Sequence, residues 1–219
     1  MIQPIQRFSL LFAARTGSSY LQTAFNNHPN MLCDNETRFV SIIYKDSQHI
    51  TPNEKAHLIP DSAQITHSGI KIPVNLQRIY QFKHHFWRDN VFKKPMLICT
   101  RNPLRSYISW QLVRENQDKW SHKSYVQPVQ IDIKAATRYV AGVNKMLQPF
   151  LEMQGQVLIL KYEDGVKVNY RKALKFLGVP YRPPQTTLIK QTIKPLHDLV
   201  ANYSELKKSR LWYFLPSDE

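Results

Sequence analysis

Cysteine is scarce in this 219-residue chain, which contains two, Cys33 and Cys99. Their spacing matches no metal site, and their number is too small for a disulfide framework. Cys99 ends an apolar run that begins at Met96, and we expect a buried, unreactive thiol there. Because a low cysteine content suits a reducing compartment, we expect a cytoplasmic location.

Long hydrophobic runs are also missing. The apolar run Phe8–Ala14 has seven residues and ends at Arg15, whereas a membrane-spanning helix needs about 18 apolar residues. The N-terminus shows no charged segment followed by a long apolar stretch, which a signal peptide would have. We therefore expect a soluble protein without a membrane span.

Acidic residues are few, since 16 Asp and Glu stand against 30 Lys and Arg, and the formal net charge is +14. A charge of this sign attracts anions. Nucleic acid, an acidic membrane surface, an anionic polysaccharide and a multiply phosphorylated cofactor all fit, and charge alone does not choose among them. The hydrophobic fraction of 42% and the chain length predict one core, hence a single domain over residues 1–219. We expect the tail after about residue 216 to be disordered.

Strand-like and helix-like apolar patterns alternate along the chain. Strands are predicted at residues 8–14, 64–72, 96–101 and 156–162. Helices are predicted from Tyr20 to just before His28 and at residues 74–86, 104–115, 133–153 and 166–177. This alternation predicts an α/β fold with a central, mostly parallel sheet flanked by helices.

The ends of three predicted strands carry groups that can bind a ligand. In an open parallel sheet, ligands bind at the carboxyl ends of the strands. We therefore expect these three segments to converge on one site: Arg15–Ser19, Lys71–Pro73 and Arg101–Pro103.

The segment Arg15-Thr16-Gly17-Ser18-Ser19 has the composition of an anion-binding loop. A short loop of small residues before a helix directs backbone N–H groups at one point, and the helix N-terminus adds a partial positive charge. Gly17 allows close approach of the backbone to a ligand, while the serines add hydroxyl donors and Arg15 adds a fixed charge. The loop is not a Walker A motif, because Gly-x-x-x-x-Gly-Lys-[Ser/Thr] is absent. An ordinary turn with a serine N-cap is the alternative.

At these residues the sequence resembles the family of sulfotransferases that use 3′-phosphoadenosine-5′-phosphosulfate (PAPS). Segment 15–19 looks like the family's 5′-phosphosulfate loop, and segment 101–109 looks like its 3′-phosphate motif, a strand-terminal Arg101 followed by Ser109 on the next helix. Arg101 can bind a phosphate with two hydrogen bonds, and Ser109 can donate from about two helical turns away. A surface arginine and an ordinary helical serine are the alternative. The resemblance runs from about Phe8 to about Leu206 and implies a P-loop-like sulfotransferase fold.

The resemblance implies further donor-binding residues. Tyr20 stands where one branch of the family has an aromatic residue that stacks on adenine, although a tyrosine in the core is the alternative. Tyr162, in a Tyr-Glu-Asp segment, corresponds to a residue near the adenosine, while Asp164 of that segment is better explained as a helix N-cap. The Gly-rich C-terminal motif of the cytosolic branch is absent, and Lys190 or Lys194 is the candidate replacement in holding the 3′-phosphate.

The resemblance also implies a mechanism in which the protein positions the reactants and stabilises charge. Glu36 lies in a Glu-Thr-Arg run like that of tyrosylprotein sulfotransferases, whose glutamate is catalytic, and we expect Glu36 to be the general base. Lys71 and Arg15 are expected to stabilise the leaving group and the sulfonate. The alternatives are a helix-start glutamate for Glu36 and a solvated strand-end lysine for Lys71. No metal is expected, and four histidines have no assigned role: His28, His67, His84 and His85.

The predicted reaction transfers a sulfuryl group from PAPS to a hydroxyl of a sugar, a tyrosine or another alcohol, which leaves PAP and a sulfate ester. The positive charge favours an anionic acceptor. Three alternatives remain. A P-loop-type nucleotide kinase lacks support because the Walker lysine and a clear Mg²⁺-binding aspartate are missing. A basic nucleic-acid-binding protein lacks a recognisable motif, so we expect no nucleic-acid partner. A family member that binds PAP without turnover is disfavoured by Glu36 and Lys71.

Overall fold

The computed structural model describes residues 5–34, 65–74, 94–116, 127–151, 156–186 and 195–214. The chain divides into two compact units, which are described separately. The first consists of Met1–Thr100 and Glu152–Leu188, and the second of Arg101–Leu151 and Ile189–Glu219. The single domain predicted from chain length stays a prediction.

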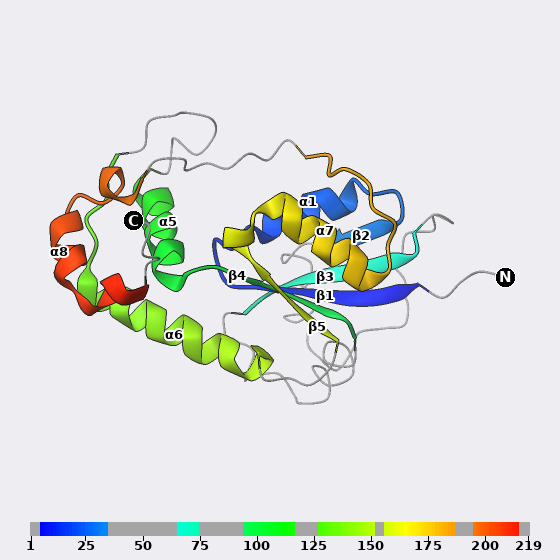
Figure 1. The fold of residues 1–219 in the computed structure, drawn as a ribbon, viewed down its shortest axis with the longest axis horizontal. Helices are drawn as coiled ribbons and strands as arrows, with labels where there is room; N and C mark the ends of the chain where they lie inside the picture. Colours follow the sequence, from blue (N-terminus) through cyan, green and yellow to red (C-terminus); the bar gives the residue numbers. More distant parts are fainter. Residues whose placement is uncertain are drawn as a thin grey trace, which may run out of the picture. The chain divides into compact units, whose positions relative to one another are not determined.

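The first unit contains a five-stranded sheet in the order β2-β3-β1-β4-β5 (Figure 1). Every pairing between neighbouring strands is parallel, which confirms the predicted α/β class. Because β1 lies between β3 and β4, the loop after β1 leaves from the middle of the sheet. The strands have these bounds: β1 Gln6–Phe12, β2 Met31–Asp34, β3 His67–Pro73, β4 Met96–Thr100 and β5 Val157–Lys161.

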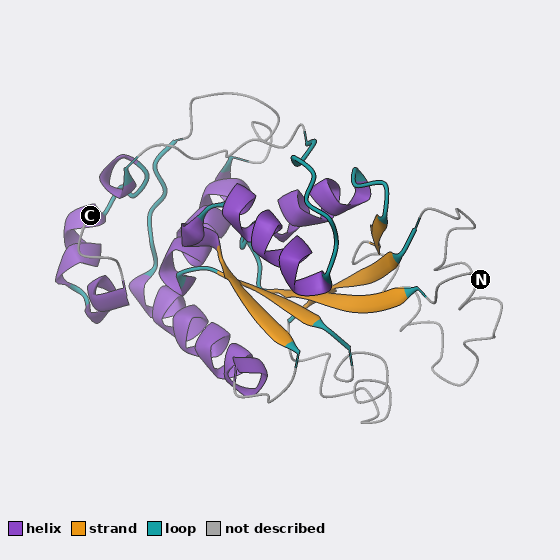
Figure 2. Cartoon of the chain, turned by 45° about the vertical axis from the view of Figure 1, so that its right-hand side comes forward, coloured by secondary structure: helices purple, strands orange, loops and turns teal. Residues whose placement is uncertain are grey.

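Helices α1 (Ser18–Asn26) and α7 (Val166–Leu177) lie side by side on one face of this sheet (Figure 1, Figure 2). Burying each large apolar side chain stabilises the fold by about 1.5–3 kcal/mol. The rings of Phe8 and Phe25 meet edge to face at 5.7 Å, an arrangement that favours aromatic attraction. The core under the two helices includes these buried residues: Phe8, Leu10, Leu21, Phe25, Leu97, Leu160, Tyr170 and Leu174.

The predicted helices agree with the structure where it describes them. Helix α7 has the predicted bounds, and α6 ends at Leu151, two residues before the predicted end. Strand β2 was not predicted, and the helix predicted at 74–86 lies outside the described residues except for Val74.

The N-cap prediction for Asp164 is wrong. A short 3₁₀ helix, η4 (Tyr162–Asp164), follows β5, so the cap position falls one residue later on Gly165. The carboxylate of Asp164 instead contacts the Lys172 ammonium at 2.7 Å. An acidic group before α7 still interacts favourably with the partial positive charge of the helix N-terminus.

The second unit has its own apolar core, which contains residues of α5 (Pro103–Glu115) and α6 (Ile133–Leu151) and of the C-terminal segment. The buried Asn202 connects two parts of this unit. Its Oδ1 accepts from the Ile131 N–H at 2.9 Å, and its Nδ2 donates to the Ile131 carbonyl at 3.0 Å. The described part of its C-terminal segment contains three short helices: η5 (Leu196–Asp198), α8 (Tyr203–Lys208) and η6 (Arg210–Phe214).

The two cysteines, Cys33 and Cys99, are free and buried thiols, as the sequence predicted for Cys99. Burial raises the pKa of the Cys99 thiol to about 12, although the positive charge of Lys71 acts in the opposite direction, so this thiol is protonated and unreactive as expected. Among the described helices, none has the length and apolar character needed to cross a membrane.

Two buried histidines hold the C-terminal end of α7 against the sheet. His67 on β3 contacts the Leu177 carbonyl through Nε2 at 2.9 Å, and its Nδ1 lies 2.8 Å from the Thr66 hydroxyl. His28 contacts the Pro180 carbonyl through Nε2 at 3.0 Å, while its Nδ1 accepts from a backbone N–H. Both rings therefore fit this network as neutral imidazoles with the proton on Nε2.

Burial lowers the pKa of both histidines, and nearby positive charge adds to the effect: Arg182 acts on His28, and His28 acts on His67. The backbone carbonyls act in the opposite direction with smaller effect. Protonation of these two histidines is less favourable in the folded protein than in the unfolded protein. Their contribution to the free energy of unfolding is therefore fully present above the ordinary histidine pKa of about 6.5, and it is lost as the pH falls below that value.

We therefore predict that the melting temperature falls between about pH 7.5 and about pH 5.5, a window in which ordinary carboxylates stay ionised. Replacing both histidines (His28→Gln with His67→Gln) should make this fall shallower, because glutamine does not titrate. Differential scanning calorimetry across the window measures both slopes. An equal slope in wild type and double variant would contradict the assignment.

Candidate active site

The loop between β1 and α1 has a backbone conformation suited to binding an anion. Arg15 (φ 66°) and Gly17 (φ 78°) are left-handed, and among the described residues Arg15 is the non-glycine residue with positive φ. Thr16 between them is therefore not left-handed, so the hand alternates along the loop. Turns with left-handed residues at such positions are found where successive backbone N–H groups bind an anion. The buried Thr16 hydroxyl donates to the Ala13 carbonyl at 2.9 Å and fixes the loop.

The first turn of α1 follows this loop directly. Gly17 is the N-cap, and no side chain caps the helix, so the serine N-cap considered from the sequence is wrong. Ser18 and Ser19 instead form the first turn, with Ser18 buried and Ser19 exposed. The uncapped first turn leaves its N–H groups to water or to an anion, and the partial positive charge of the helix favours an anion.

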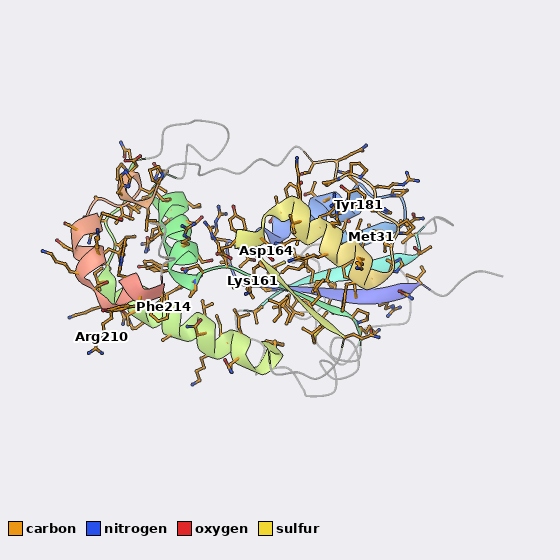
Figure 3. The ribbon with its side chains drawn as sticks, in the orientation of Figure 1. Met31, Lys161, Asp164, Tyr181, Arg210 and Phe214 are labelled. Atoms are coloured by element: carbon orange, nitrogen blue, oxygen red, sulfur yellow. The ribbon has the colours of Figure 1, made fainter. Side chains whose placement is uncertain are left out.

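Gly17 also lies against η4 and the first residue of α7. A Cβ atom at Gly17 would lie 2.9 Å from Cδ2 of Tyr162 and 3.3 Å from Cγ1 of Val166. The structure thus brings Tyr162 to the anion-binding loop, although the two are 145 residues apart in sequence. Its predicted contact with adenosine stays a prediction. Figure 3 shows Lys161, the last residue of β5, and Asp164, the last residue of η4, at this end of β5.

Lys71 places a buried ammonium beside the same loop. Its side chain is 4% exposed, so the solvated lysine considered from the sequence is wrong. The Nζ atom lies 3.2 Å from the Ser19 hydroxyl and 4.6 Å from the centre of the Phe12 ring, whose face attracts cations. Lys71 pairs in register with Leu10 of the neighbouring strand β1. The predicted convergence of the first two strand ends is therefore confirmed.

Tyr20 packs against the core under α1 and α7. Burial raises the pKa of its phenol, and interaction with Tyr181 adds to that effect. The structure is consistent with a tyrosine at the edge of the core, and its predicted contact with adenine stays a prediction.

In the second unit, Arg101 lies directly before Asn102, which caps the N-terminus of α5. Asn102 is the N-cap of α5, where its Oδ1 accepts from the N–H groups of Leu104 and Arg105, each at 3.1 Å. Pro103 follows at the first helical position, which suits its fixed φ. Ser109 lies buried on α5. The capping role of Asn102 was missed, although Asn-Pro before an apolar helix is a signal for it.

Tyr139 on α6 is a further residue that sequence analysis missed. Burial raises the pKa of its phenol, and the positive charge of Arg101 opposes this, so Arg101 lies near Tyr139 within the second unit. No pattern in the sequence connects a residue before α5 with one on α6 in this way. Glu36 and Lys190 lie outside the described residues. Across the ranges that the structure describes, no group of three or more His, Cys, Asp or Glu side chains could hold a metal ion.

Comparison with known proteins finds relatives over most of the chain. No protein-family model matches. Nodulation protein H of Rhizobium meliloti is 24% identical over 93% of this chain and 91% of its own, and Nodulation protein H of Rhizobium tropici is 24% identical over 92% and 88%. The structure is similar to a sulfotransferase from Alicyclobacillus acidocaldarius, with a TM-score of 0.50 and 18% identity over 86% of this chain and 87% of the other. At this identity the structural similarity shows the fold.

The geometry of Gly17 predicts that Gly17→Ala weakens binding of PAP at least about tenfold. A left-handed alanine costs about 1–2 kcal/mol, and the added methyl would also press against the Tyr162 ring. Gly178→Ala is the matched control, because Gly178 is also left-handed (φ 72°) but a Cβ there meets nothing within 4 Å. Isothermal titration calorimetry with PAP measures both. Unchanged PAP affinity in a folded Gly17→Ala protein would refute the loop assignment.

Proposed function

Since the similarities in sequence and fold support assigning this chain to the sulfotransferase family, we propose that it transfers a sulfuryl group from PAPS to the hydroxyl of an acceptor. The products are PAP and a sulfate ester. The observation that carries this proposal is the position of Lys71, whose buried ammonium lies 3.2 Å from the Ser19 hydroxyl of the anion-binding loop.

A buried cation beside backbone N–H groups suits a leaving group that gains negative charge. In sulfuryl transfer, the acceptor oxygen attacks sulfur while the bond from sulfur to the bridging oxygen breaks. The bridging oxygen keeps the electron pair and becomes part of PAP. Lys71 and the N–H groups at the start of α1 stabilise that charge, and burial of the Lys71 ammonium strengthens its interaction with the charge. Arg15 adds charge on the sulfonate side.

The remaining roles follow the two motifs. Arg101 and Ser109 bind the ribose 3′-phosphate, which distinguishes PAPS from ATP. Asn102 supports Arg101 by capping the helix that follows it. Tyr162 and Tyr20 are the candidate contacts of the adenosine. Glu36 accepts the acceptor proton, and Lys190 completes the 3′-phosphate site. The net charge of +14 favours an acceptor that is itself anionic. A cytoplasmic location stays part of the proposal.

The test compares PAP with ADP, which lacks the 3′-phosphate, by thermal shift. PAP at 100-fold excess over its dissociation constant should add about 2.7 kcal/mol of stability, while ADP at the same concentration adds much less. Arg101→Gln should remove most of the difference. Arg138→Gln is the matched control, because this arginine is exposed on α6.

Two outcomes would contradict the proposal. Equal stabilisation by PAP and ADP would show that the 3′-phosphate is not recognised. Stabilisation that requires Mg²⁺ would instead indicate a nucleotide kinase, whose phosphate-binding site depends on the metal.

A further inference from the structure

The C-terminal end of the second unit exposes aromatic and basic side chains together. Tyr213 is 88% exposed and Phe214 is 44% exposed. Lys207, Lys208 and Arg210, which lie immediately before them on α8 and η6, are exposed as well. Figure 3 shows Arg210 and Phe214 at this end of the unit. We call these five residues the aromatic–basic corner.

The corner is held in place by its inward-facing neighbours. Leu211 is buried in the core of the second unit. The Trp212 ring packs edge to face against Tyr203 at 5.6 Å, and the Lys207 ammonium lies 5.6 Å from the centre of the same ring. The Asn102 amide donates to the Phe214 carbonyl. Because Leu211 and Trp212 anchor η6, Tyr213 and Phe214 are presented outward.

The charge of the corner is positive, and within the described residues no ion pair neutralises it. In the part of the chain that the structure describes, neither of the two ion pairs contains Lys207, Lys208 or Arg210. The one acidic residue of α8 is Glu205, whose carboxylate accepts from the Asn202 amide at 3.1 Å. Three exposed cations and two exposed aromatic side chains therefore lie within residues 207–214.

This combination matches the surface of an anionic bilayer. Tyrosine and other aromatic residues favour the boundary between lipid headgroups and acyl chains. Lysine and arginine are attracted to anionic headgroups at the same depth, each raising the partition constant about fivefold. An acidic polysaccharide would bind the cations but would leave Phe214 without an apolar partner. We propose that the aromatic–basic corner docks the protein on an anionic phospholipid surface.

Vesicle co-sedimentation of the full chain tests this proposal. The protein should bind vesicles made of equal amounts of phosphatidylcholine and phosphatidylglycerol, and should not bind phosphatidylcholine alone. Added salt should weaken the binding, because it screens the attraction of exposed charges. Vesicle binding is measured without PAPS, so this result does not depend on whether the protein uses PAPS.

Three variants distinguish membrane binding by the aromatic–basic corner from diffuse attraction by the net charge of the protein. Removing the aromatic side chains should lower the partition constant on the order of tenfold, and removing the three positive charges should lower it roughly 100-fold. The control removes three exposed charges from α7 and should change binding much less. The variants are Y213S/F214S for the rings, K207Q/K208Q/R210Q for the charges and K167Q/R171Q/K175Q for the control.

Three results would overturn the proposal. An equal loss in the α7 control would show diffuse attraction by net charge. Full binding in Y213S/F214S would show that the rings do not enter the bilayer. Binding to heparin without binding to anionic vesicles would assign the corner to a soluble polyanion. Melting temperatures of all variants, compared with wild type, establish that each retains its fold.

Discussion

The close approach of Gly17 to the Tyr162 ring is the constraint on which the rest of the candidate site depends. A Cβ atom at position 17 would lie only 2.9 Å from that ring, so a residue other than glycine fits there only if the ring or the loop shifts. The same glycine is left-handed and is the N-cap of α1. Gly17 therefore combines a left-handed backbone, the start of α1 and close packing against Tyr162.

Lys71 gives this point its charge. Ammonium groups are rarely buried without compensation, and at 4% exposure Lys71 contacts a hydroxyl and an aromatic face that both belong to the site. Its charge also acts on the buried Cys99 thiol, in opposition to burial. Parallel pairing of β3 with β1 brings this lysine to the loop, so the sheet order and the chemistry depend on each other.

Apolar periodicity and capping residues predicted the elements whose bounds depend on neighbouring residues in the sequence. Helix α7 has the predicted bounds because its apolar face repeats at helical spacing, and Gly178 ends it in a left-handed conformation. Strand β2 was missed because four residues carry too little pattern. Pairing with β3 and the Asn26 side chain, which both donates to and accepts from the Cys33 backbone, hold β2 in place. The loop at 15–19 was found from residue types, whereas its contacts with Lys71 and Tyr162 depend on folding.

The most direct measurement is the rate at which labelled sulfur leaves PAPS in a single turnover, with enzyme in saturating excess over the donor, for wild type and Lys71→Met. Methionine has similar length and fits a buried site without the charge. The account predicts that wild type converts PAPS to PAP, passing the label to an acceptor hydroxyl or to water. It predicts a rate at least about 100-fold lower in Lys71→Met, the loss expected for removing one group that stabilises transition-state charge. Equal rates in the two proteins would contradict a catalytic role for the buried lysine beside the loop.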